Sequence, residues 1–264
     1  MLPFYKKCIL QVYLYTIYWA IAAVRYATVK LLSLVWYLVQ ILPLSDAIFS
    51  RLLLIVYGCF ATKPYQASLL QNKKPANFKL QKNTIICGQL TSPVDVLLYI
   101  KEFRPQKVLL PNNKFVSPAT AFKSIMSLED QFTCDELPQK FPQQRILVFP
   151  EQFPTNQSVA MKTYISSTYF LNRPVICAAS VKNWAFIPKQ HPFINFLTNI
   201  DDMGSIVYRQ KLFVTVFKQS DDFAEDKVQK GIASCLGVEC GKQGLKERTE
   251  YYNFWKQWDS QQKD

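Results

Sequence analysis

The amino-acid sequence predicts an α/β domain with a mixed sheet flanked by helices, preceded by a hydrophobic helical hairpin that anchors the chain in a membrane. Two observations carry this prediction. After about residue 63, short runs rich in β-branched residues alternate with helical patterns, an arrangement typical of α/β folds. The preceding region is almost continuously apolar and rich in tyrosine and tryptophan, which favour membrane interfaces.

The N-terminal region contains three apolar runs: residues 8–24, residues 26–42 with Lys30 among them, and residues 52–60. A transmembrane helix needs about 20 apolar residues, and the first run is slightly shorter. Arg25 and Lys30 would lie poorly at the bilayer centre, although long basic side chains can extend toward an interface. Lys6 and Lys7 favour a cytosolic N-terminus. The apolar region lacks a small-residue cleavage site, so we do not expect a cleaved signal peptide. We expect a hairpin returning to the cytosolic side; a single crossing helix and a buried soluble helix pair are the alternatives.

Four short runs are typical of strands in a buried sheet: residues 84–87, 107–110, 145–149 and 174–178. A longer run rich in valine and phenylalanine, residues 206–217, predicts a further strand.

Helices are predicted between and after these strands. Residues 118–126 form one, with Ser117 as N-cap and Pro118 at the first helical position, where a missing N–H costs nothing. Asp222 and Glu225 resemble a capping box for a second helix. One apolar face and a glycine stop define that helix: Ala224, Val228, Ile232, Leu236 and Gly237. A last helix is expected in the tail, residues 245–258.

The chain therefore divides into three parts. Residues 1–62 form the membrane anchor, residues 63–220 the α/β domain, and residues 221–264 a C-terminal helical extension.

Charge and cysteine content narrow the classes of partner. The formal net charge is +12, and basic residues beside a membrane anchor favour anionic headgroups. The sequence contains no motif that recognises a groove of nucleic acid, so we expect membrane lipid and no nucleic acid as partner. The seven cysteines are scattered without a CxxC pair or Cys/His cluster, which predicts buried free thiols, no disulfide framework, no metal and no bound cofactor.

Four motifs follow one another along the predicted strands. They are Gln89-Leu90-Thr91-Ser92-Pro93-Val94-Asp95, Val148-Phe149-Pro150-Glu151, Thr155-Asn156-Gln157, and Arg173-Pro174-Val175-Ile176-Cys177-Ala178. Their order and spacing resemble the glycerolipid (lysophosphatidic acid) acyltransferase superfamily, over roughly residues 65–220. The resemblance implies an acyltransferase-type mixed sheet, with Asp95 in the catalytic motif and a substrate-binding set of Glu151, Thr155, Asn156 and Arg173.

Further features are similar to one family within that group, the ancient ubiquitous protein 1 family. They are the paired hydrophobic N-terminus running into Leu42-Pro43-Leu44-Ser45-Asp46, the Thr-Asn after Phe-Pro-Glu, and a helix ending in Leu236-Gly237. The resemblance implies a location on the endoplasmic reticulum membrane and lipid droplets, with the domain facing the cytosol. It also implies ubiquitin and quality-control proteins as partners. The ubiquitin-binding and enzyme-recruiting modules of longer members are not expected within residues 1–264.

The catalytic motif departs from the superfamily pattern at its central position. Relatives carry Asn-His before the four residues and the aspartate, and their histidine accepts the proton of the attacking hydroxyl. Here Gln89 and Leu90 occupy those two positions. Loss of a general base costs on the order of 10²–10⁴ in rate. The only histidine, His191, lies in none of the motifs.

Two hypotheses follow. The first is a membrane-anchored acyltransferase-like protein with lost or weak catalysis, acting in lipid-droplet biology or protein degradation at the endoplasmic reticulum. The second is an active lysophospholipid acyltransferase that uses acyl-CoA as co-substrate. Without a histidine, we expect Thr91-Ser92-Pro93 and Asp95 to end the strand and cap the next helix.

Overall fold

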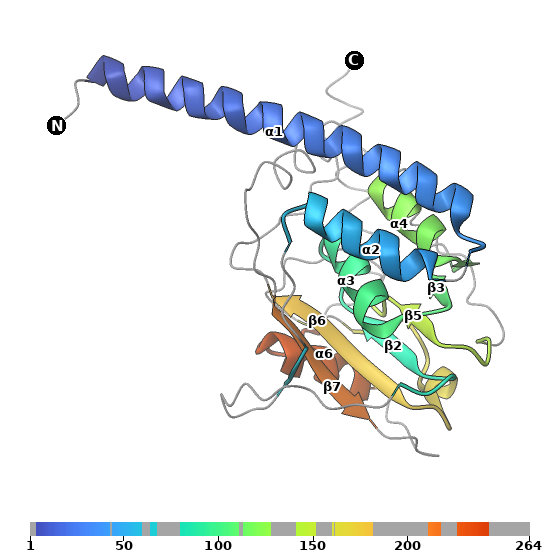
Figure 1. Cartoon of the computed structure of the whole chain (residues 1–264). Helices are drawn as coiled ribbons and strands as arrows, with labels where there is room; N and C mark the ends of the chain where they lie inside the picture. Colours follow the sequence, from blue (N-terminus) through green and yellow to red (C-terminus); the bar gives the residue numbers. More distant parts are fainter. Residues whose placement is uncertain are drawn as a thin grey trace, which may run out of the picture.

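A mixed sheet of seven strands forms the centre of the described part of the chain. Figure 1 shows the computed structural model. The structure describes residues 4–42, 44–59, 64–67, 80–110, 113–127, 141–151, 160, 162–181, 211–217 and 226–242. The strands are β1 (Tyr65–Gln66), β2 (Ile85–Gly88), β3 (Lys107–Leu109), β4 (Phe115–Val116), β5 (Ile146–Val148), β6 (Val175–Val181) and β7 (Lys211–Phe217). Their order in the sheet is β1-β7-β6-β2-β5-β3-β4.

Strand direction places the carboxyl ends of the four central strands at one edge of the sheet. β6, β2, β5 and β3 are mutually parallel along that order. β7 is antiparallel to β6 and parallel to β1, and β4 is antiparallel to β3. The predicted mixed sheet is confirmed, and the four predicted central strands appear with ends shifted by at most three residues. The fifth predicted strand appears as β7, and residues 206–210 lie outside the described residues.

Five α-helices and a 3₁₀ helix are described. They are α1 (Phe4–Val39), α2 (Ser45–Val56), α3 (Pro93–Phe103), α4 (Pro118–Ser127), η1 (Ser167–Phe170) and α6 (Lys227–Leu236). The Ser117 hydroxyl accepts the Thr120 N–H at 3.3 Å, which confirms the predicted N-cap of α4. Gly237 has a φ of 70° at the end of α6, which confirms the predicted stop. Asp222, Glu225 and the tail 245–258 lie outside the described residues.

The sheet is covered on both faces by apolar side chains. Successive residues of β2 point to opposite faces, so Ile86 packs in the cluster with α3 and α4, whereas Ile85 and Cys87 pack in the cluster with α6. Near-continuous burial is expected of parallel strands covered on two sides. Cys59, Cys87, Cys177 and Cys235 are buried and free, as the sequence predicts; Cys240 is free and exposed.

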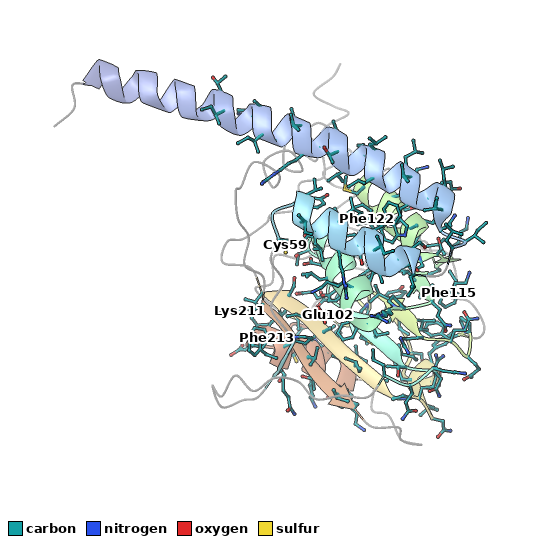
Figure 2. The ribbon with its side chains drawn as sticks, in the orientation of Figure 1. Cys59, Glu102, Phe115, Phe122, Lys211 and Phe213 are labelled. Carbon is teal, nitrogen blue, oxygen red and sulfur yellow. The ribbon has the colours of Figure 1, made fainter. Side chains whose placement is uncertain are left out.

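The two N-terminal helices form a hairpin that packs on α3 and α4 (Figure 1). Trp36 of α1 is fully buried and donates its indole N–H to Asp46 of α2 at 2.9 Å. Its ring stacks on Phe49 and meets Phe122 of α4, whose place beneath α1 is labelled in Figure 2. One face of the second half of α1 and one face of α2 therefore share a hydrophobic core with α3 and α4.

α1 is continuous through the charged residues between and within the first two apolar runs. Lysine and arginine are good helix formers, so Arg25 and Lys30 do not end the helix. The Lys30 ammonium lies 5.4 Å from the centre of the Tyr26 ring, one turn earlier. Among the described residues, one segment is long and apolar enough to cross a membrane, the 21 residues Trp19–Val39. Length and composition alone also fit the core helix of a soluble protein or a signal sequence.

Gly231 allows α6 to lie directly on the sheet. A Cβ at this position would lie 2.7 Å from Cys177 Sγ and 2.8 Å from the Phe217 ring. We expect Gly231→Ala to lower the free energy of unfolding by about 1–3 kcal/mol, because the added methyl group overpacks the core. Urea unfolding of the purified chain measures this difference.

Gly237→Asn is the matched control for that experiment. No heavy atom lies within 4 Å of a Cβ built on Gly237, and asparagine tolerates the left-handed backbone of this residue. The control should change the unfolding free energy by less than about 1 kcal/mol. Equal stability of the two variants would contradict the close packing of α6.

Candidate functional site

The turn between β2 and α3 is held by one buried carboxylate. Asp95 occupies the third position of α3, Ser92 is the N-cap, and Pro93 is the first helical residue. Ser92 and Asp95 form a capping box. The prediction that Thr91-Ser92-Pro93 and Asp95 end the strand and cap the helix is confirmed.

Both carboxylate oxygens of Asp95 accept hydrogen bonds. Oδ2 accepts the Thr91 N–H at 2.8 Å, the Thr91 hydroxyl at 2.5 Å and the Ser92 N–H at 2.8 Å. Oδ1 accepts the Ser180 hydroxyl from the end of β6. Each carboxylate oxygen offers about two acceptor sites, so its three bonds saturate Oδ2, whereas Oδ1 accepts one bond. Asp95 is fully buried, and the N-terminus of α3 adds a favourable dipole to its charge.

Glu151 and Gln89 meet at the same edge of the sheet. Gln89 follows β2, and Glu151 follows β5. The side-chain amide of Gln89 donates a hydrogen bond to Glu151 Oε2 at 3.4 Å. Both side chains are buried. The first two motifs of the sequence therefore come together at the carboxyl edge of the parallel strands, where open α/β sheets place their ligands.

Tyr99 closes this edge from α3. Its hydroxyl donates to the backbone carbonyl of Gln89 at 2.7 Å and lies 3.3 Å from that of Ala178. Burial, together with the charges of Asp95 and Glu151, holds the pKa of Tyr99 well above its usual range. The phenol therefore stays protonated and acts as a donor.

Leu90 lies within the core. Only 2% of its surface is exposed, and it belongs to the hydrophobic cluster shared by α1 to α4. An aliphatic side chain has no titratable group, so Leu90 supplies packing here. The chain's single histidine, His191, lies outside the described residues.

The structure does not bring Arg173 to this edge. Arg173 precedes β6, at the opposite end of the strand from Ser180. Its guanidinium donates to the carbonyls of Asn83 and Gln144, each at 2.8 Å, and burial lowers its pKa. These contacts tie together the loops that enter β2 and β5. Thr155 and Asn156 lie outside the described residues.

Ser180 and Tyr99 were not found from the sequence. Tyr99 lies four residues after Asp95, one helical turn along α3, so its proximity could have been inferred from periodicity. Ser180 is 85 residues from Asp95 in the chain, and no local pattern indicates their contact.

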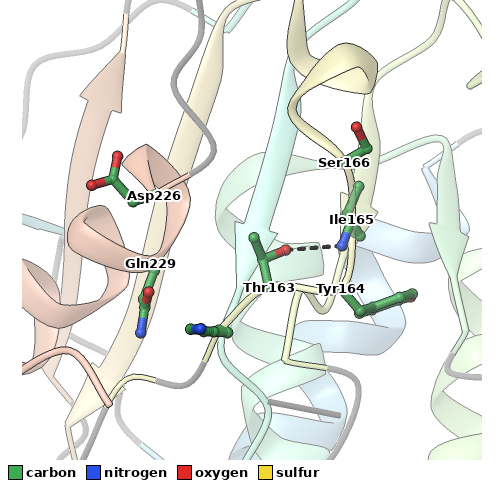
Figure 3. Close-up of a pocket in the computed structure, with 7 residues that line it drawn as sticks. Thr163, Tyr164, Ile165, Ser166, Asp226 and Gln229 are labelled. Atoms are coloured by element: carbon green, nitrogen blue, oxygen red, sulfur yellow. Dashed lines mark hydrogen bonds between the residues drawn. The ribbon is translucent and has the colours of Figure 1, made fainter. Parts of the chain in front are cut away.

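A pocket of about 370 Å³ lies beside α6, on the side of the sheet opposite α3 (Figure 3). It is lined by Lys162, Thr163, Tyr164, Ile165, Ser166, Asp226 and Gln229. Its polar groups largely bond within the protein: the Gln229 amide donates to the carbonyls of Ala160 and Gly241, and Thr163 Oγ1 accepts the Ile165 N–H at 3.1 Å. The pocket contains none of the residues of the four motifs.

No cluster of three metal-ligating side chains occurs among the described residues. No protein-family model matches the sequence, and no curated protein or solved structure matches it either.

Replacing Asp95 tests its structural role. We expect Asp95→Ala to lower the free energy of unfolding by about 2–4 kcal/mol, because buried donors of Thr91, Ser92 and Ser180 lose their acceptor. Glu102→Ala is the control in the same helix, since Glu102 pairs only with the adjacent Lys101 near the surface. The control should stay within about 0.5 kcal/mol of the parent. Two equally stable variants would show that Asp95 does not hold the fold.

Introducing a histidine at position 90 should not create a base. Leu90→His introduces a polar ring into an apolar cluster, beside an Asp95 that already accepts four hydrogen bonds from Thr91, Ser92 and Ser180. We expect a loss of about 1–3 kcal/mol in unfolding free energy, with no gain of acyl transfer. Leu90→Met, which nearly conserves volume, should cost less than about 1.5 kcal/mol. Denaturant unfolding measures the change in unfolding free energy, and an acyl-transfer assay measures activity. Acyl transfer by Leu90→His would contradict the prediction.

Proposed function

We propose that this chain is a membrane-anchored protein with a glycerolipid-acyltransferase-like domain that does not transfer acyl groups through its motif. The hydrogen bonding of Asp95 carries the proposal. In a working motif this carboxylate would orient an imidazole and stabilise its charged form. Here Thr91 and Ser92 saturate Oδ2, the Ser180 hydroxyl donates to Oδ1, and Leu90 offers no proton acceptor.

The surroundings of the motif support the same proposal. Gln89, Leu90, Asp95 and Glu151 are each at least 94% buried, so little of their surface is open to a hydroxyl or a thioester. A general base needs a free lone pair within hydrogen-bond reach of the proton that it removes. Glu151 is the remaining carboxylate at this edge, and its Oε2 lies beside the Gln89 amide.

We propose the endoplasmic reticulum membrane and the lipid-droplet surface as the location, with the domain on the cytosolic side. The apolar α1 supports membrane association, and the similarity of the motifs to the ancient ubiquitous protein 1 family supports the choice of membrane. The same similarity supports a role in lipid-droplet biology or in protein degradation at the endoplasmic reticulum, with ubiquitin-system proteins as partners. Membrane lipid is the proposed ligand of the anchor.

The alternative is an active acyl-CoA-dependent lysophospholipid acyltransferase. The meeting of Gln89 and Glu151 at the carboxyl edge of the sheet favours it, because this edge is where an acyl acceptor would bind. The two hypotheses differ in whether Glu151 contributes to turnover.

An acyl-transfer assay separates them. The full chain, reconstituted in phospholipid vesicles, is incubated with labelled acyl-CoA and lysophosphatidic acid. We expect product only at the level of protein-free vesicles, because Leu90 offers no base and the carboxylates of Asp95 and Glu151 are buried. Glu151→Gln should leave this background unchanged.

Glu239→Gln is the control, because Glu239 is an exposed glutamate outside the motifs. Turnover by the parent chain that Glu151→Gln abolishes and Glu239→Gln preserves would establish the active enzyme and refute the proposal.

A further inference from the structure

We propose that α1 lies in the plane of an anionic lipid surface, with one face among the acyl chains and the opposite face on the domain. This inference rests on the membrane association proposed above and goes beyond it. It states that Trp19–Val39 does not cross the bilayer, although its length and composition would allow it to do so.

Two opposite faces of α1 are apolar. At about 100° per residue, Val24, Leu31 and Leu38 lie within about 20° of one direction. They are 67%, 62% and 68% exposed. Ala22, Val29 and Trp36 are fully buried and lie within about 40° of the opposite direction. A helix that is apolar all round is normally covered on all sides, whereas the domain covers only one side of this helix.

The uncovered face is long and continues into the turn that joins α1 to α2. From Val24 to Leu38 it extends for about 21 Å at 1.5 Å per residue. Beyond the helix, Ile41, Leu42 and Leu44 are 91%, 60% and 69% exposed. Figure 2 shows side chains projecting from α1 on the side away from the domain. A continuous apolar surface of this length indicates an interaction site.

Cations border this face on both sides. Lys30 lies about 100° to one side of its centre, and Arg25 lies about 120° to the other. The sequence of α1 contains no aspartate or glutamate. An interfacial helix has this arrangement, because its apolar face enters the acyl chains while lysine and arginine reach the headgroups. A second copy of the chain would bring the same cations together, so charge favours an anionic lipid surface over a homodimer.

Contacts with the domain prevent the same segment from crossing the bilayer. The stripe from Ala22 to Trp36 packs on α2 and α4. A crossing helix would take these neighbours into the hydrocarbon, together with the exposed Arg51 of α2 and Lys123 of α4. Each such charge is strongly unfavourable at the bilayer centre. In the plane of the surface, α1 keeps its contacts with α2 and α4, places its exposed apolar face among the acyl chains, and leaves its cations at the headgroups.

A depth profile of α1 tests the orientation. A fluorescent amino acid is placed in turn at positions 22 to 38 of the full chain, bound to vesicles of phosphatidylcholine and phosphatidylserine. Lipids carrying a quencher at a shallow or a deep acyl position report the depth of each site. We expect quenching that repeats about every 3.6 residues, with maxima at Val24, Leu31 and Leu38 and minima at Val29 and Trp36. The shallow quencher should be the stronger one at every maximum.

Other profiles would overturn the inference in distinguishable ways. Quenching without a helical repeat that becomes deepest near the middle of α1 would indicate a crossing helix; the membrane association would then stand and the orientation would fail. No quenching at any position would refute both. An unquenched face whose residues crosslink between chains would identify a homodimer and refute the lipid surface.

Vesicle flotation gives a second readout. Leu31→Asp combined with Leu38→Asp should lower the vesicle-bound fraction roughly tenfold or more, because both charges enter the proposed contact. Both positions are exposed, so the fold should be preserved. Val216→Asp is the control, since Val216 of β7 is also a large exposed apolar residue, 43% exposed. Equal binding of the double variant and the control would overturn the assignment of this face.

Discussion

The hydrogen bonding of one buried carboxylate joins the central elements of this fold. Asp95 receives backbone and side-chain donors from the turn after β2, starts α3, and receives the hydroxyl of Ser180 at the end of β6. A buried charge without partners would cost several kcal/mol, so these donors and the carboxylate depend on one another. The positions of β2, α3 and β6 at this edge follow from satisfying that single group.

This constraint explains why the turn depends on Asp95 although no histidine stands at position 90. In the superfamily that the motif resembles, the aspartate serves a histidine; here it serves backbone N–H groups that any chain making this turn must satisfy. Leu90 can then pack as part of the core, since the turn needs nothing from its side chain. The presence of Asp95 is therefore no sign of acyl-transfer chemistry, because its role in the turn accounts for it.

Local signals predicted the elements, and long-range contacts account for what was missed. The N-cap at Ser117, the stop at Gly237 and the capping turn at Ser92 and Asp95 each depend on residues within four positions of one another. The contact of Ser180 with Asp95 joins distant segments, and the displacement of Arg173 from the site follows from which end of β6 it precedes. The sequence showed that α1 is apolar, but which of its faces the domain covers depends on α2 and α4.

The stacking of helices links the proposed lipid surface to the motif edge. α1 packs on α2, α2 packs on α3, and α3 begins at the turn that Asp95 holds. Trp36 joins α1 to α2 through its hydrogen bond to Asp46, and its ring contacts Phe122 of α4. A tilt of α1 would therefore disturb this core. If α1 lies in the plane of a lipid surface, the carboxyl edge of the sheet is held at one angle to that surface. A rigidly oriented domain of this kind can present partner-binding surfaces at a membrane without any turnover at Asp95.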